Sequence, residues 1–232
     1  MSSRLSVVVL SQNNRHNLPI FLLQLLKHIE EAGLEEVKIT VIDNSSDDGS
    51  DLIVEAMSKT FRSLSLIRFE NPLSESDLLV RSLSEVSGDY LALFLTPGVS
   101  PGKIDSYIYE VGGDQFAVFR GSVFGFSLSD PNLLLRGFFW WLIDLITPNN
   151  TLPLRSYGFL LHKELAEQVA KEMAVGDQSI SGLARALLRN KGVAKVHDIL
   201  GAPLVAFLKP WWKFLWGALK IRVLSLAVRR KS

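Results

Sequence analysis

Polar side chains that can hydrogen-bond a nucleoside follow two apolar segments of the chain. Residues 10–14 read Leu-Ser-Gln-Asn-Asn after the first segment, and residues 43–49 read Asp-Asn-Ser-Ser-Asp-Asp-Gly after the second. The carboxylate of Asp43 and the carboxamide of Asn44 suit a base edge or a ribose hydroxyl, and the short side chains beside them let a ligand approach the backbone. An Asx-rich turn that caps the following helix explains residues 43–49 equally well.

Strands that alternate with helices must position these two segments. The first helix is predicted from the apolar three-and-four spacing that starts at Asn17, with Asn17 as capping residue, Pro19 in the first turn and Gly33 at the end. Further helices are predicted to end near Lys59 and to cover Ser76–Val86. The predicted strands are Leu5–Leu10, Val37–Ile42, Leu64–Phe69 and Tyr90–Leu95. This alternation predicts an α/β fold with a mostly parallel sheet and helices on both faces, which binds ligands beyond the carboxyl ends of its strands.

The second half of the chain has a less regular pattern. Strands are predicted at Phe116–Phe119 and Tyr157–Leu161, and helices at Asn132–Ile146, Glu164–Met173 and Gln178–Leu188. Because no internal repeat or low-complexity linker interrupts the chain, we expect one domain over residues 1–202 and an appended tail over 203–232.

The distribution of charge separates the tail from the rest of the chain. Residues 209–232 hold seven Lys and Arg and no acidic residue, which leaves 18 basic against 24 acidic residues in 1–208. An acidic body argues against a nucleic-acid binder, whose basic residues normally lie on the folded domain. The absence of cysteine excludes disulfides and thiolate-held metals.

Three motifs in residues 5–95 resemble glycosyltransferase family 2. The residues that match are Asn13 in the first motif, Asp43, Asn44, Ser46, Asp48 and Gly49 in the second, and Gly88, Asp89 and Tyr90 in the third. A weaker match runs from Asp114 to about Leu200, where residues 154–160 resemble a region of that family's polyprenyl-phosphate sugar transferases. The resemblance implies a GT-A (Rossmann-like) fold and a UDP- or GDP-linked sugar donor. It implies that the residues contacting the nucleotide are Leu10, Gln12, Asn14, Asp43, Asn44 and Ser45.

The chain departs from this family where the family binds its metal ion. The Asp-x-Asp that follows the fourth strand is replaced by Leu95-Thr96-Pro97-Gly98, which offers no carboxylate to a hard cation. We therefore expect no metal cofactor, and we expect metal-independent transfer if the protein is active. Lys103, Arg120 or Arg155 can replace the cation at the phosphates, unless they are ordinary solvated side chains. Asp177 is the candidate general base, and a helix N-cap is the alternative role for it.

The tail combines tryptophans with basic residues. Trp211, Trp212 and Trp216 alternate with lysines, a composition typical of a helix at an anionic membrane surface. A helix that packs back on the domain or on a partner is the alternative, and Leu133–Ile146 fits a second membrane-facing element or a core helix. The longest uncharged run of the C-terminal region, Ile199–Leu208, is too short to span a bilayer.

The sequence is compatible with two functions. The first is sugar transfer to a lipid phosphate or glycan by a protein peripheral to the cytoplasmic face of a membrane. The second is an inactive relative that serves as a nucleotide-binding or membrane scaffold, and either form can assemble into homo- or hetero-oligomers.

Overall fold

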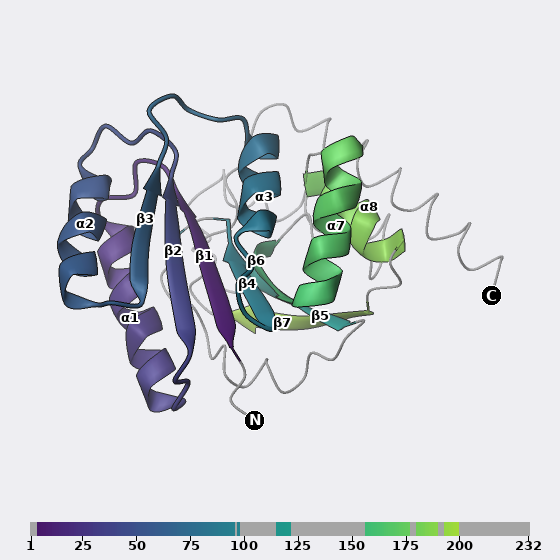
Figure 1. The fold of residues 1–232 in the computed structure, drawn as a ribbon, viewed down its shortest axis with the longest axis horizontal. Helices are drawn as coiled ribbons and strands as arrows, with labels where there is room; N and C mark the ends of the chain where they lie inside the picture. The colour runs from purple at the N-terminus through teal and green to yellow at the C-terminus, as the bar shows by residue number, and fades with distance from the viewer. Residues whose placement is uncertain are drawn as a thin grey trace, which may run out of the picture.

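The computed structural model describes residues 4–95, 97, 115–121, 156–176, 180–189 and 193–199. The strands in these residues are β1 (Leu5–Ser11), β2 (Val37–Asp43), β3 (Leu64–Arg68), β4 (Tyr90–Phe94), β5 (Gln115–Gly121), β6 (Ser156–His162) and β7 (Val193–Ile199). Within the described part of the chain, they form one seven-stranded sheet in the order β3-β2-β1-β4-β6-β5-β7 (Figure 1).

The order of the strands reverses beside β1. From β1 the chain adds β2 and β3 on one side, and it then returns to place β4 on the other side of β1, with all these pairs parallel. Strand β6 runs antiparallel to both β4 and β5, while β7 is parallel to β5. The point between the carboxyl ends of β1 and β4 is therefore a topological switch point, where open α/β sheets bind their ligands.

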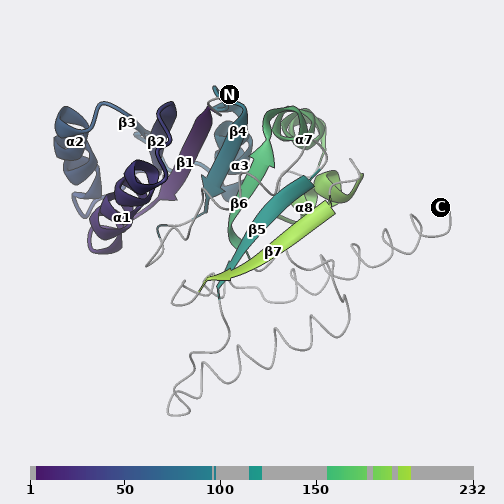
Figure 2. The same cartoon turned by 90° about the horizontal axis from the view of Figure 1, so that it is seen from below.

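Helices cover both faces of the sheet, as the alternation of strands and helices predicts. The helices of the described residues are α1 (Asn17–Glu31), α2 (Ser50–Thr60), α3 (Glu75–Ser84), α7 (Lys163–Val175) and α8 (Ile180–Arg189). Figure 2 shows α1 and α2 on one side of the sheet and α3, α7 and α8 on the other. The expected α/β fold with a mostly parallel sheet is thus confirmed.

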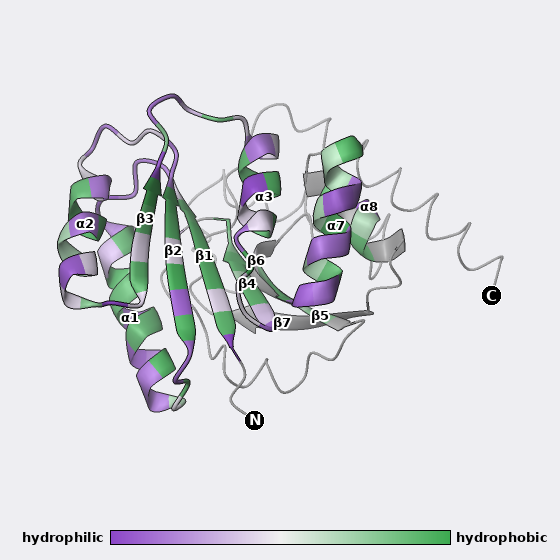
Figure 3. Cartoon of the chain, in the orientation of Figure 1, coloured by the Kyte–Doolittle hydropathy of each residue, from purple (hydrophilic) through white to green (hydrophobic). Residues whose placement is uncertain are grey.

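Each face of the sheet has its own core, because successive strand residues point to opposite faces. On the α1 and α2 face, Phe21 and Phe94 are fully buried and meet edge to face, with ring centroids 5.0 Å apart. The core of the α3, α7 and α8 face contains Leu93 and Phe159. Figure 3 shows hydrophobic residues along β1 and β2, whereas α3 and α7 carry hydrophilic residues on their outer sides.

The N-cap of the first helix lies one residue before the predicted one. His16, not Asn17, is the N-cap, and it makes no side-chain cap. The carbonyl oxygen of Asn14 instead accepts the N–H groups of Asn17 and Leu18, at 3.1 and 2.9 Å. The predicted end is confirmed, because Gly33 follows the helix with a positive φ of 63°.

The motif Gly88-Asp89-Tyr90 lies at the amino ends of β1 and β4, away from the switch point. The carbonyl oxygen of Arg4 accepts the N–H of Asp89 at 2.7 Å, and Asp89 Oδ2 accepts the N–H of Arg4 at 3.0 Å. A Cβ at Gly88 would lie 2.5 Å from the Arg4 carbonyl oxygen, so only glycine allows this approach. The motif therefore aligns the two central strands.

Strand β7 was not predicted from the sequence, and the helix predicted at Asn132–Ile146 lies outside the described residues, as does the boundary between 202 and 203. In the part of the chain that is described, no helix is long and apolar enough to cross a membrane.

Candidate functional site

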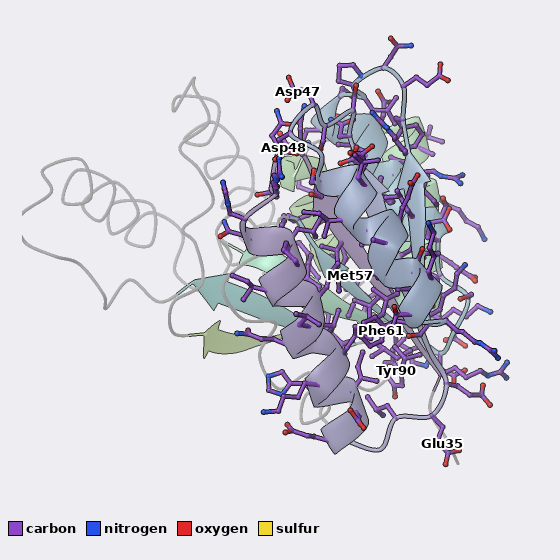
Figure 4. All side chains as sticks on the ribbon, turned by 90° about the vertical axis from the view of Figure 1, so that its left-hand side faces the viewer. Glu35, Asp47, Asp48, Met57, Phe61 and Tyr90 are labelled. Carbon is purple, nitrogen blue, oxygen red and sulfur yellow. The ribbon has the colours of Figure 1, made fainter. Side chains whose placement is uncertain are left out.

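The loops that leave β1 and β2 lie side by side at the carboxyl edge of the sheet. The first loop (residues 12–16) and the second loop (residues 44–49) follow Ser11 and Asp43, which are paired in the register of the two strands. Figure 4 shows Asp47 and Asp48 of the second loop at one end of the molecule and Glu35, which precedes β2, at the opposite end. The polar segments singled out in the sequence thus meet at the edge that contains the switch point.

A network of hydrogen bonds joins the two loops. Ser46 Oγ accepts the N–H of Asn13 at 3.0 Å, and Asn13 Oδ1 accepts the N–H of Asp47 at 3.0 Å. At the base of the loops, the N–H of Asn44 donates to the carbonyl oxygen of Ser11 at 2.9 Å. Because each loop uses side chains to satisfy the backbone of the other, the two loops form one rigid unit.

Both non-glycine residues with positive φ in the described part of the chain lie in these loops. They are Asn13, with φ 53°, and Ser45, with φ 60°. Such backbone conformations cost free energy and persist where surrounding bonds impose them, and they are often found at ligand sites. The Ser45 hydroxyl donates to the carbonyl oxygen of Glu70 at 3.0 Å, which ties the second loop to the segment after β3.

The carboxylate of Asp43 is committed to the turn that follows it. Asp43 is 1% exposed, its Oδ2 accepts the N–H of Ser46 at 3.0 Å, and its Oδ1 accepts the Ser46 hydroxyl. The Asx turn that the sequence offered as an alternative is therefore present. It does not cap the next helix, whose N-cap is Gly49 without a side-chain bond.

Asn44 bridges the second loop to the chain before α3. Its Oδ1 accepts the N–H of Leu73 at 2.7 Å and its Nδ2 donates to the carbonyl oxygen of Leu73 at 3.2 Å. The same Nδ2 donates to Gln12 Oε1 at 3.4 Å. Asn44 is 5% exposed, whereas Gln12 is exposed, so Gln12 is the member of this pair that a ligand can reach.

The remaining predicted contacts have different environments. Leu10 is buried in the core of the α3, α7 and α8 face. Asn14 is half-buried, and its Nδ2 donates to the Gln12 carbonyl oxygen at 2.9 Å. Lys103, Arg155 and Asp177 lie outside the described residues, and Arg120 lies in β5 with a side chain that is not described.

The electrostatics of the second loop centre on Asp48. Desolvation alone would raise the pKa of this carboxyl group, but hydrogen bonds with Ser50 and with the backbone N–H of Arg15 outweigh it and hold the pKa below the ordinary value of 3.8. Asp48 is therefore ionised at neutral pH, next to the N-terminus of α2, where a negative charge is favourable.

Sequence reasoning missed two contributors to this edge. Leu73 acts through its backbone, which no side-chain pattern reveals, and Arg15 joins the loops through its N–H and its guanidinium. The contact between the two loops did have a signal in the sequence. Asn13 and Ser46, which join the loops, both match motifs of the family that the sequence resembles.

The end of β4 offers apolar residues. Leu95 is half-buried and Pro97 is buried, while Thr96 and Gly98 lie outside the described residues. Among the residues that the structure describes, no three His, Asp or Glu side chains are grouped so that they could hold a metal ion. No described residue is therefore assigned as a metal ligand.

No protein-family model matches the sequence, and no curated protein matches it significantly. Solved structures do match its fold. Mannosyltransferase PcManGT from Pyrobaculum calidifontis, in complex with GDP-Man and Mn²⁺, has a TM-score of 0.62 and 14% identity, over 99% of this chain and 65% of that one. The chain has the GT-A glycosyltransferase fold.

Two synthases share the GT-A fold with the chain. Mannosyl-3-phosphoglycerate synthase from Rubrobacter xylanophilus has a TM-score of 0.60 and 14% identity, over 99% of this chain and 76% of that one. Glucosyl-3-phosphoglycerate synthase from Mycobacterium tuberculosis, in complex with phosphoglyceric acid, has a TM-score of 0.57 and 16% identity, over 96% and 79%. The chain thus spans less than two thirds of PcManGT and about three quarters of the two synthases.

The expectation that no metal cofactor is involved is contradicted by these structures. PcManGT contains Mn²⁺ with GDP-Man, and the Mycobacterium tuberculosis synthase has been solved with Mn²⁺ and UDP-glucose and with Mg²⁺ and UDP. The physical reason is that a diphosphate needs a cation whether or not one particular pair of carboxylates is present. The loss of Asp-x-Asp at residues 95–98 was therefore insufficient ground for that expectation.

Proposed function

We propose that this GT-A chain binds a UDP- or GDP-linked sugar at the carboxyl edge of its sheet and transfers the sugar to an acceptor. The observation that carries the proposal is the position of the joined first and second loops beside the switch point of β1 and β4. The GT-A folds that it resembles include structures with GDP-Man and with UDP-glucose, which supports this donor class.

The residues at this edge have different proposed roles. Gln12 contacts the nucleoside, because it is exposed, whereas buried Asp43 and Asn44 hold the second loop in place. The side chains of Ser45 and Asn14 support the loops by donating to the backbone carbonyl oxygens of Glu70 and Gln12, and Leu10 is buried in the core.

For residues outside the described part, we propose that Lys103 and Arg155 contact the phosphates and that Asp177 is the general base. A divalent cation, when bound, neutralises the diphosphate leaving group.

The proposed acceptor is a lipid phosphate or a glycan at the cytoplasmic face of a membrane. This proposal is supported by the composition of residues 203–232, which combine tryptophans with Lys and Arg. Co-sedimentation with vesicles that contain phosphatidylserine tests it, with a variant truncated after residue 202 as the comparison. Truncation should abolish binding to the vesicles, and equal binding by both proteins would remove the membrane from the proposal. The Mycobacterium tuberculosis synthase was solved with phosphoglyceric acid, so a small soluble acceptor is the outcome to assay next.

A second candidate is a protein that binds the nucleotide sugar without transferring the sugar. Leu95 and Pro97 favour it, because they stand where glycosyltransferase family 2 has carboxylates. Release of UDP or GDP in the presence of Mn²⁺ and acceptor distinguishes transfer from binding alone.

Titration calorimetry with UDP-glucose and GDP-mannose tests donor binding. We expect binding of at least one donor in the presence of Mn²⁺ or Mg²⁺, and weaker binding after Gln12→Ala. The matched control is Gln168→Ala, which removes a carboxamide that is also exposed, from α7. Absence of binding by the unmodified protein, with cation and with chelator, would refute the nucleotide site.

A further inference from the structure

The backbone of Leu73 determines how the Asn44 carboxamide is oriented. A backbone N–H can only donate and a carbonyl oxygen can only accept. Because the Leu73 N–H lies 2.7 Å from one end of the carboxamide and the Leu73 carbonyl oxygen lies 3.2 Å from the other, the first end must be Oδ1 and the second Nδ2. The usual ambiguity of an asparagine side chain is thus removed.

The orientation of Asn44 in turn orients Gln12. Asn44 Nδ2 donates to Gln12 at 3.4 Å, so the end of the Gln12 carboxamide that faces Asn44 must be Oε1. The Nε2 end is then left to donate, and among the described residues it has no partner. The backbone of Gln12 is also held, since Asn14 Nδ2 donates to its carbonyl oxygen at 2.9 Å.

These hydrogen bonds, from Leu73 to Asn44 and from Asn44 to Gln12, leave only the N–H groups of Gln12 to meet a base. We therefore propose that Gln12 selects nucleotides whose base carries an exocyclic carbonyl oxygen. Uracil and guanine carry such an oxygen, as thymine O4 and guanine O6 do in the major groove, whereas adenine presents an amino donor at the same place. Gln12 is the specificity-determining residue and Asn44 is a positioning residue. The inference rests on the proposed function, because it concerns the base of the proposed donor.

The rigidity of the two loops makes this selection effective. If Gln12 could turn over freely, its carbonyl oxygen would accept from adenine and the preference would vanish. The bonds between Asn13, Ser46 and Asp47 hold the first loop against the second, and the Asn44 N–H donates to the Ser11 carbonyl oxygen directly below. Turning Gln12 over would place two amino groups against each other.

Calorimetry with UDP, GDP and ADP, in the presence of Mg²⁺, tests the inference. The unmodified protein should bind UDP or GDP about tenfold or more tightly than ADP, since the adenine amino group and the Gln12 N–H groups would face each other without an acceptor. Gln12→Glu keeps the size of the side chain and its acceptor for Asn44, but it replaces the donor by a carboxylate oxygen. It should weaken the binding of UDP and GDP by about tenfold to a hundredfold, and it should not weaken ADP, because the new oxygen can accept from the adenine amino group.

Two further variants separate selection from folding. Asn44→Asp can still accept from the Leu73 N–H but cannot donate to Gln12, so Gln12 is released and the preference over ADP should fall. Gln168→Glu makes the same chemical change on exposed α7 and should alter none of the three affinities. Thermal unfolding of each variant shows whether it is folded.

The outcomes distinguish this inference from the proposed function. If the unmodified protein binds none of the three nucleotides, the nucleotide site itself is refuted, and the inference with it. If it binds UDP or GDP but Gln12→Glu binds as before, or loses all three nucleotides alike, the site stands and the role of Gln12 is refuted. Selective loss of UDP and GDP supports both.

Discussion

The backbone N–H of Arg15 donates to Asp48 Oδ2 at 2.8 Å, and the Arg15 guanidinium donates to the backbone carbonyl oxygen of Asp48 at 3.2 Å. This reciprocal pair lies at the outer end of the network that joins the first and second loops. The Asp48 carboxylate also accepts the N–H of Ser50 at 3.0 Å, at the start of α2. One carboxylate therefore connects both loops to a helix.

Replacement of Asp48 should give a stability loss that depends on pH. The pKa of Asp48 is depressed in the folded protein, so its contribution is present above the ordinary value of 3.8 and is lost as the pH falls through the lower folded value. We expect Asp48→Asn to lower the Tm at neutral pH, and we expect the difference from the unmodified protein to close below pH 3.8. Thermal unfolding followed by circular dichroism between neutral and acidic pH measures it. Asp47→Asn is the control, because the Asp47 side chain is exposed, and a Tm difference for Asp48→Asn that is constant with pH would contradict the assignment.

Asn13 allows the strain of its backbone to be separated from its hydrogen bond. Both Asn13→Ala and Asn13→Gly remove the acceptor for the Asp47 N–H, but only alanine must then occupy a φ of 53° without a polar side chain. We expect Asn13→Ala to be less stable than Asn13→Gly by about 1 kcal/mol in the free energy of unfolding, measured with urea. Equal stabilities would mean that the backbone relaxes at this position.

Gly88 should be intolerant of even a methyl group. The added Cβ would lie 2.5 Å from the Arg4 carbonyl oxygen, which is fixed by the N–H groups of Asp89 and Tyr90. Gly88→Ala should therefore cost about 1–3 kcal/mol in the free energy of unfolding. Gly33→Ala provides the comparison, since no atom lies within 4 Å of its Cβ and only the positive φ opposes it, at about 1 kcal/mol. A smaller loss at Gly88 than at Gly33 would contradict the close approach.

The ion pair between Asp51 and Arg68 should stabilise the packing of α2 on β3. The Asp51 side chain is 5% exposed and accepts from Arg68 Nη1, whereas Arg68 is about half exposed. Asp51→Asn should cost about 1–3 kcal/mol in urea unfolding, because Arg68 then faces a neutral carboxamide instead of a carboxylate. Glu55→Gln, at an exposed position of the same helix, should change the free energy of unfolding by less than about 0.5 kcal/mol. Equal effects of the two substitutions would show that the pair contributes nothing.

The first half of the fold could be predicted because its strands are short apolar runs between regular helices. Strands β1 to β4 and helices α1 to α3 have the predicted positions to within two residues at most ends. Strand β7 (Val193–Ile199) escaped prediction because Lys195, His197 and Asp198 interrupt its apolar pattern. Its parallel pairing with β5 depends on residues distant in the sequence.

The location of the candidate site could be predicted from the sequence, but the contacts among its side chains could not. The ends of β1 and β2 were identified from Gln12 and Asp43, whose residue types stand out after apolar runs. Which side chains a ligand can reach depends on contacts across about thirty positions, such as those of Asn44 with Gln12 and with Leu73. The sequence allowed Asp43 either to contact a nucleoside or to form an Asx turn. Its hydrogen bonds with Ser46 show that the turn is formed.

The pairing of β1 with both β2 and β4 has a consequence during synthesis on the ribosome. Leu5 has its first neighbour once Val37 has been translated, but its second, Tyr90, comes much later. Until then, one row of N–H and C=O groups along Leu5–Val9 lacks its strand partner, and such open edges recruit strands from other chains. The nascent chain is therefore expected to depend on chaperones most strongly after β2 has emerged and before β4 has.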